Sequence, residues 1–210
     1  MPRRSYDQYC PLSRALDAIG ERWTLLIVRE LLAGPRRYTD LHADLPGVST
    51  DVLAARLREM EHDGLVARRR LPPPAAATVY ELTPRGEDLL PVLTALADWG
   101  SADLDGPRPT DALRAHWSAL PLMRQLAGLA LPGDGIVNIQ LGEGTFHILI
   151  SHSGPSYGHG PAEHADAQLT LDSHTCQLAS QNDTTLAELI KTGQIRVDGD
   201  SPLAQALRGR

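Results

Sequence analysis

The feature that most limits how this chain can fold is a change of periodicity after residue 63. Ser49 is a suitable N-cap for a helix that runs to about Asp63, and Gly64 is a suitable C-terminal stop. The residues that follow, "LVARRRL" and "TVYEL", change to a strand-like period and give two short strand candidates. The intervening "PPPAAA" predicts an unpaired tip that proline stiffens. We therefore expect a helix followed directly by a hairpin.

Helices are also expected before this unit. Apolar residues recur at helical spacing over residues 12–19 and 23–32, and a shorter helix is predicted over 39–45. Gly-Pro or Pro-Gly pairs end the second and third of these segments. Three helices followed by a two-stranded hairpin are the elements of a winged helix.

The best domain boundary lies near residue 103. Thr83-Pro84 opens a predicted helix to about Trp99, whose apolar side requires a partner that a second subunit could supply. The next segment, "GSADLDGPRPT", is rich in Gly, Pro and Asp, as linkers are. The sequence thus predicts one domain over residues 1–103 and a second over 104–210.

The second half has the pattern of an α+β domain. A helical stretch is expected from Asp111 to about Leu131. Strict alternation of apolar and polar residues in "VNIQL", "FHILI", "AQLTL" and "QIRVD" predicts half-buried strands of an antiparallel sheet, with "LGEGTF" as a tight hairpin. Two helices, over 173–180 and 184–192, would cover one face of the sheet.

Composition limits the class of protein. The chain has 210 residues, 42% of them hydrophobic, and no apolar run approaches the roughly 18 residues of a membrane span. The start, "MPRRSYDQYC", lacks the apolar segment of a secretory signal. We therefore expect a cytoplasmic protein with Cys10 and Cys176 as free thiols.

The net charge of −6 argues mildly against a nucleic-acid partner, but the placement of charge matters more than its sum. Nine of the twelve arginines in the first 70 residues, Arg3 and Arg4 among them, could form one basic face. On the predicted helix after Ser49, Leu53, Leu57 and Met60 share an apolar side. Small and polar residues lie opposite, which would let the backbone approach a DNA groove. The predicted DNA contacts are Arg36, Arg37, Ser49, Thr50, Asp51, Ala54, Arg56, Arg58, Arg68, Arg69 and Arg70.

Two of these residues have alternative interpretations. Arg56 could pair with a helix carboxylate instead of DNA. Asp51 lies two residues past the cap, where its charge favours the helix N-terminus by about 0.3–1 kcal/mol. It could equally accept a hydrogen bond from a cytosine amino group in the groove.

The first half closely resembles the HxlR family of bacterial winged helix-turn-helix regulators. The resemblance covers residues 5–100 and rests on the Cys-Pro start, "GERWTLL", "GPRRY" and "YELTPRG". It implies a homodimer, paired through the N-terminal segment and the helix after the hairpin, that binds a palindromic operator in two major grooves. The chain departs from the family at Thr50-Asp51 and at Ala76-Ala77 in the hairpin tip, which affects sequence preference and not the fold.

The second half resembles a sterol carrier protein type 2 domain. The most specific portion is "HADAQLTLDSHTCQLASQNDTTLAELIKTGQIRVDGD". The resemblance implies an apolar tunnel for a small hydrophobic effector and no catalysis. Ordinary core packing is the alternative for each of its predicted lining residues, which are Trp117, Leu120, Met123, Leu126, Phe146, Ile148, Leu178, Leu189 and Ile190.

Three further chemistries can be weighed from the sequence. The Cys-Pro start resembles a thiol-sensor position of some relatives, so Cys10 is a redox candidate. Five histidines between His147 and His174 match no zinc-ligand spacing, and "HSGPSYGHGPAEH" is expected to be a mobile loop. No catalytic or cofactor-binding motif is present in the sequence. We therefore expect a ligand-modulated homodimeric DNA-binding regulator, with a thiol-switched regulator that uses the second domain only for dimerisation as the alternative, and no enzyme.

Overall fold

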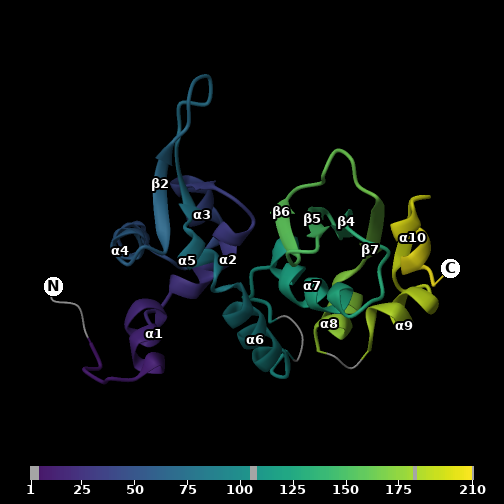
Figure 1. Cartoon of the computed structure of the whole chain (residues 1–210), viewed down its shortest axis with the longest axis horizontal. Coiled ribbons are helices and arrows are strands. Elements are labelled where there is room, and N and C mark those ends of the chain that lie inside the picture. Colours follow the sequence, from purple (N-terminus) through teal and green to yellow (C-terminus); the bar gives the residue numbers. More distant parts are fainter. Residues whose placement is uncertain (1–4, 105–107, 182–183, 210) are drawn as a thin grey trace. The chain divides into compact units, whose positions relative to one another are not determined.

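The computed structural model describes residues 5–104, 108–181 and 184–209, and it divides into two compact units between Leu90 and Pro91 (Figure 1). Arg3 and Arg4, which belong to the predicted basic face, lie outside the described residues. The division falls before the predicted boundary at 103/104. None of the described helices is both long enough and apolar enough to cross a membrane.

The first unit is a winged helix. Its elements are α1 (Pro11–Ile19), α2 (Thr24–Leu32), β1 (Arg36–Arg37), α3 (Tyr38–Asp44), α4 (Thr50–His62), β2 (Val66–Arg70), β3 (Thr78–Leu82) and α5 (Pro84–Glu87). The three strands form an antiparallel sheet in the order β1-β3-β2. In Figure 1 the loop between β2 and β3 extends well beyond the helices. The predicted hairpin and its unpaired tip are therefore confirmed.

Two details of this unit differ from the prediction. The third strand, β1, is two residues long, too short to leave an alternating pattern. The helix expected from Thr83 to Trp99 is two helices, α5 and α6 (Leu90–Ser101). Pro91 has no N–H to donate to the carbonyl four residues earlier, so the helix of α5 cannot continue through it.

The second unit is built on a five-stranded sheet. After a 3-10 turn at Ala115–Ser118 and α7 (Ala119–Ala127) come β4 (Gly135–Leu141), β5 (Gly144–Ile150), β6 (Ser156–His159), β7 (Ala167–Leu171), α8 (Ser173–Ser180), α9 (Leu186–Lys191), β8 (Arg196–Asp198) and α10 (Pro202–Leu207). The strand order is β6-β5-β4-β7-β8. Val137, Ile139, Phe146 and Ile148 are fully buried, so the alternation in the sequence marks the core face of the sheet.

The α+β class and the β4–β5 hairpin are as predicted, with two differences in detail. One strand pair, β4 with β7, is parallel, whereas the other pairs are antiparallel. The loop predicted after β5 contains strand β6, in which Tyr157 and Gly158 are buried. A Cβ on Gly158 would lie 2.5 Å from the His147 ring, so β6 requires a glycine at this position. The sequence pattern had indicated a loop for the whole segment.

The helical content of this unit also differs from the prediction. The stretch predicted as helix from Asp111 begins only at Ala115, because the Asp111 carboxylate closes a turn on the Arg108 N–H. The last helix, α10, was not predicted. Its cap is the Ser201 hydroxyl, which accepts a hydrogen bond from the Ala204 N–H at 3.0 Å.

Candidate nucleic-acid interface

The start of α4 is held from two sides. The Ser49 hydroxyl accepts a hydrogen bond from the Val52 N–H at 3.3 Å, which confirms Ser49 as the N-cap. The Tyr38 hydroxyl, from α3, donates to the Thr50 carbonyl at 2.7 Å. Tyr38 therefore fixes the end of α4 that a winged helix presents to DNA. We had not predicted this role, although Tyr38 ends the "GPRRY" motif of the sequence.

The two faces of α4 are separated as the sequence predicts. Leu53, Leu57 and Met60 are buried, whereas Thr50, Asp51 and Arg58 are exposed and Ala54 is half-buried. The Asp51 carboxylate accepts no hydrogen bond from the described residues, because Ser49 makes the cap. The helix-dipole interaction and the base contact of Asp51 therefore both stay predictions.

A polar clamp joins the C-terminal end of α4 to the base of the wing. The Thr83 hydroxyl donates to the Gly64 carbonyl at 2.5 Å and accepts from the Gly86 N–H at 3.2 Å, while the Thr83 N–H donates to the Leu65 carbonyl. A Cβ on Gly86 would lie 2.2 Å from that Leu65 oxygen. The Leu-Thr-x-x-Gly sequence is therefore explained by close packing: a hydroxyl is needed at the threonine and no side chain at the glycine.

Three of the predicted DNA-binding arginines are engaged by carboxylates. Arg36 pairs with Asp44, and Arg69 pairs with Glu81 at 2.8 Å. Arg56 pairs with Glu59 of its own helix and with Glu21 at 3.4 Å. These contacts favour a structural role for Arg56, the alternative that the sequence left open, and the side chains of Arg36 and Arg56 are less than a fifth exposed.

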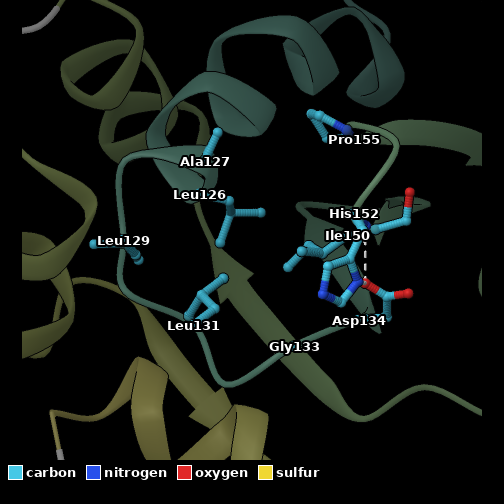
Figure 2. Close-up of a pocket in the computed structure, with 10 residues that line it drawn as sticks. Leu126, Ala127, Leu129, Leu131, Gly133, Asp134, Ile150, His152 and Pro155 are labelled. Carbon is cyan, nitrogen blue, oxygen red and sulfur yellow. Dashed lines mark hydrogen bonds and ion pairs between the residues drawn. The ribbon is translucent and has the colours of Figure 1, made fainter.

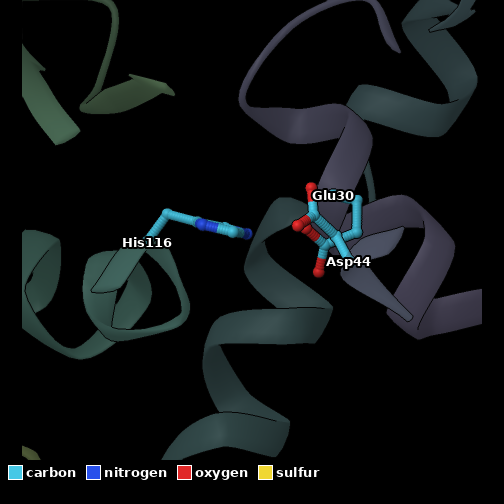
Figure 3. Close-up of side chains that lie close together, drawn as sticks. All are labelled: Glu30, Asp44 and His116. Atoms are coloured by element: carbon cyan, nitrogen blue, oxygen red, sulfur yellow. The ribbon is translucent and has the colours of Figure 1, made fainter. Parts of the chain in front are cut away.

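The environment of Arg36 is part of a larger charge cluster inside the first unit. Figure 3 shows the carboxylates of Glu30 and Asp44 next to each other, and oxygens of the two lie within 4.8 Å. Arg29 pairs with Glu30 at 2.7 Å, as Arg36 does with Asp44. Since two neighbouring carboxylates repel each other unless cations balance them, Arg36 is needed within the fold.

The remaining predicted arginines are exposed. Within the described part of the chain, Arg37, Arg58, Arg68 and Arg70 form no ion pair, and all four side chains reach solvent. Arg68 and Arg70 lie on the same face of β2, opposite Tyr80 and Thr78, and they line a hollow of about 440 Å³ at the wing. Among the described arginines that the sequence predicts as DNA contacts, these four are left available to phosphate groups.

The residues predicted to line an apolar tunnel lie in the second unit, and most belong to its core. Leu120, Met123, Leu126, Phe146, Ile148 and Leu189 are buried, and Trp117, Leu178 and Ile190 are partly buried. A pocket of about 270 Å³ opens beside α7 and the end of β5 (Figure 2). Of the nine predicted residues, Leu126 alone lines it, so their role in ligand binding stays a prediction.

Cys10 is the N-cap residue of α1 and is partly exposed. The backbone N–H groups of Ser13 and Leu12 and the Ser13 hydroxyl lower the pKa of the Cys10 thiol. Burial raises the pKa of the other thiol, Cys176. The pKa of Cys10 is thus shifted down and that of Cys176 up, which makes Cys10 the more reactive thiol.

Comparison with known proteins identifies both halves. The model of the HxlR-like helix-turn-helix family matches residues 18–107, and that of the SCP-2 sterol transfer family matches residues 118–209. The first match includes α6, so it extends beyond the point between Leu90 and Pro91 at which the two compact units divide.

The relatives in sequence are bacterial regulators. An uncharacterized HTH-type transcriptional regulator of Bacillus subtilis, YvaP, is 36% identical over 99 residues, which cover 47% of this chain and 92% of that protein. The HTH-type transcriptional regulator YodB of the same organism is 34% identical, over 43% of this chain and 81% of YodB. Among solved structures, reduced YodB superimposes with a TM-score of 0.42 at 30% identity, over 48% of this chain and all of that one. The chain belongs to the HxlR-like helix-turn-helix family of transcriptional regulators, and its second half is a domain of the SCP-2 sterol transfer family.

Proposed function

We propose that this chain acts as a homodimeric transcriptional regulator whose α4 helices enter two successive major grooves of a palindromic operator. The observation that carries the proposal is the pairing state of the arginines: Arg37, Arg58, Arg68 and Arg70 are exposed without carboxylate partners in the described structure. Arg58 lies on α4 and Arg68 and Arg70 lie on β2 of the wing, while Arg37 directly precedes Tyr38, whose hydroxyl bonds to the start of α4. Arg37 and Arg58 would contact the backbone near the recognition helix, and Arg68 and Arg70 the adjacent flank.

Selection of binding sites from a random-sequence DNA library tests the proposal. We expect the selected sites to contain two inverted half-sites whose centres are separated by about one helical turn, roughly 34–36 Å. Recovery of single asymmetric sites would contradict the dimeric mode. Recovery of random sequence would contradict specific DNA binding altogether.

Exposed apolar side chains support the homodimer. Tyr9 and Leu12, at the start of α1, are exposed, Leu12 by 67%. On α6, Leu96 and Trp99 are exposed, Trp99 by 78%. Large apolar side chains exposed on a surface favour a protein partner when they form a patch, and pairing of two copies of the chain would cover these. Sedimentation of the wild type and of Leu12→Glu and Trp99→Glu variants tests this role. We expect a dimer that both changes weaken, and a wild-type monomer at micromolar concentration would contradict it.

We further propose that the second domain binds a small hydrophobic molecule and that binding changes operator affinity. Membership of the SCP-2 sterol transfer family and the mainly apolar pocket beside α7 support this step. Thermodynamic coupling is reciprocal: if the ligand changes the affinity of the protein for DNA by some factor, DNA changes the affinity for the ligand by the same factor. Ligand titration with and without operator DNA therefore checks the coupling from both sides.

A thiol switch at Cys10 is a second candidate function, favoured by the lowered pKa at the N-cap of α1. In this alternative the second domain only supports dimerisation. The thiolate would be oxidised by a peroxide to a sulfenic acid, with the peroxide reduced to water or an alcohol. Operator binding of wild type and Cys10→Ser before and after peroxide treatment decides the matter. A response that persists in Cys10→Ser would exclude this switch.

A further inference from the structure

The pocket of the second domain has an apolar floor and one polar rim. Leu126, near the end of α7, faces Ile150, at the end of β5, across the opening (Figure 2), and Leu129, in the loop after α7, also lines the pocket. Leu131 closes the side toward the loop that leads into β4. The apolar residues thus come from three separate segments that converge on one hollow.

The rim is formed by Asp134 and His152, whose side chains lie together in Figure 2. His152 Nδ1 lies 2.5 Å from Asp134 Oδ1, and the His152 N–H donates to the same oxygen at 2.9 Å. Both contacts use Oδ1, so the described residues leave Asp134 Oδ2 available to a ligand. The hydroxyl of Ser151, also at the rim, is committed to the Gly154 carbonyl and the Ser153 hydroxyl.

The charge of the rim selects among ligands. Asp134 and His152 are the ionisable groups among the residues that line the pocket, and no lysine or arginine accompanies them. An anionic head group would meet the Asp134 carboxylate without a compensating fixed cation. A hydroxyl or an ammonium group could instead donate a hydrogen bond to Oδ2.

The volume sets the size of the ligand. At about 270 Å³ the pocket lies just below the roughly 300–1,000 Å³ of common small-molecule sites. It is too small for a lipid with two acyl chains. We propose that this pocket is the effector site of the chain and binds a small single-chain apolar molecule whose polar end is an amine or a hydroxyl. The regulatory role of this site rests on the proposed ligand modulation, whereas the binding of the molecule to the pocket does not.

A matched series of head groups tests the chemistry. The full-length protein is titrated at pH 8 with octylamine, octan-1-ol and octanoate while amide NMR signals of Leu131, Ile150 and their neighbours are followed. We expect octylamine and octan-1-ol to bind, with octanoate at least about threefold weaker, as an exposed ion-pair interaction allows. Equal or tighter binding of octanoate, or no binding of any of the three, would overturn the proposal.

Two variants locate the site. Asp134→Asn keeps an oxygen that accepts from the His152 N–H but removes the charge, so the ratio of octylamine to octanoate affinity should fall toward one. Glu143→Gln makes the same charge change in the exposed turn at the other end of the β4–β5 hairpin and should leave the ratio unchanged. If both variants keep the wild-type ratio, Asp134 does not recognise the head group.

Filling the pocket gives an independent check. Ala127 is exposed at the end of α7 and lines the pocket, so Ala127→Trp should abolish octan-1-ol binding without disturbing the core. Ala187→Trp, on an exposed position of α9 outside the pocket, is the matched control. Octan-1-ol binding that survives in Ala127→Trp would refute this location.

The binding test is separate from the test of regulation. If the probes bind as expected but operator affinity does not change, the site is supported and the ligand modulation is contradicted. An effector that changes operator affinity equally in Ala127→Trp and wild type would retain the modulation and sink this site.

Discussion

The two halves of the chain differ in what their proposed functional surfaces are made of. In the winged helix the surface is a set of exposed cations. Hydrogen bonds of Ser49, Tyr38 and Thr83 hold the two ends of α4 in place. In the second domain it is an apolar hollow at the end of a core, with one acidic rim. Charge can therefore be removed from the first surface without filling or emptying a core, whereas the second surface borders residues on which the fold depends.

The largest expected effect comes from the core of the second domain. Phe146 is fully buried on β5, and Phe146→Ala should lower the free energy of unfolding of this domain by about 3–5 kcal/mol. Leu149→Ala on the same strand removes a side chain that is 38% exposed and should cost clearly less. Calorimetry of both variants checks the contrast. An equal loss for the two would mean that β5 does not carry the core in this way.

Gly86→Ala should be the next most damaging change, and it acts on the first domain. The added Cβ would meet the Leu65 carbonyl oxygen at 2.2 Å, and forcing such a contact costs about 1–3 kcal/mol. Gly100→Ala is the control, because nothing lies within 4 Å of a Cβ there. Thermal unfolding should show a lower midpoint for the first variant alone. If the two midpoints fall equally, the clamp at the base of the wing is not required.

A smaller effect is expected from the charge at the start of α4. Asp51 is exposed, and removing its repulsion of phosphates in Asp51→Asn should raise affinity for all DNA sequences by roughly two- to fivefold, as for one exposed charge interaction. Binding to the operator and to unrelated DNA of equal length measures this. A relaxed preference at one base pair, without a general rise, would instead indicate that Asp51 contacts a base.

The smallest change concerns the thiols. Since the pKa of Cys10 is lowered by hydrogen bonds from the backbone of Ser13 and Leu12, its thiolate forms at lower pH than in an ordinary cysteine, and its alkylation should reach half its maximal rate at a lower pH than that of an ordinary thiol. Cys176, with a pKa raised by burial, should react more slowly at every pH. Mass spectrometry of iodoacetamide-treated protein distinguishes the two sites. A Cys10 midpoint at or above that of an ordinary thiol would remove the basis of the redox alternative.

Much of the fold could be predicted from the sequence, because local signals and the tertiary structure agree there. Ser49 is an N-cap in both, the α4 face of Leu53, Leu57 and Met60 is buried, and α8 has the predicted limits. The break before α6 depends on Pro91 in a segment whose apolar spacing continues unchanged. The parallel pairing of β4 with β7 leaves no local signal, since alternation is the same in either orientation.

The site was predictable in composition but not in detail. The sequence identified the arginines, but Arg36, Arg56 and Arg69 are paired with carboxylates that lie up to 35 residues away along the chain. Spacing alone does not reveal the partners Glu21 and Glu81. Tyr38 was missed because its hydrogen bond reaches a backbone carbonyl, which any residue could supply. The pocket is formed by ends of elements, where apolar residues have no regular period.

The most direct test of the central claim is the salt dependence of operator binding for two multiple variants. In one, the exposed Arg37, Arg58, Arg68 and Arg70 are all changed to Gln, and in the other the paired Arg36, Arg56 and Arg69 are changed. Each lost phosphate contact should reduce the slope of log affinity against log salt by about 0.9. We expect the first variant to lose most of the wild-type slope and the second, measured under conditions where it is folded, to keep it. An equal loss of slope in the second variant, or a wild-type affinity that does not change with salt, would contradict the account.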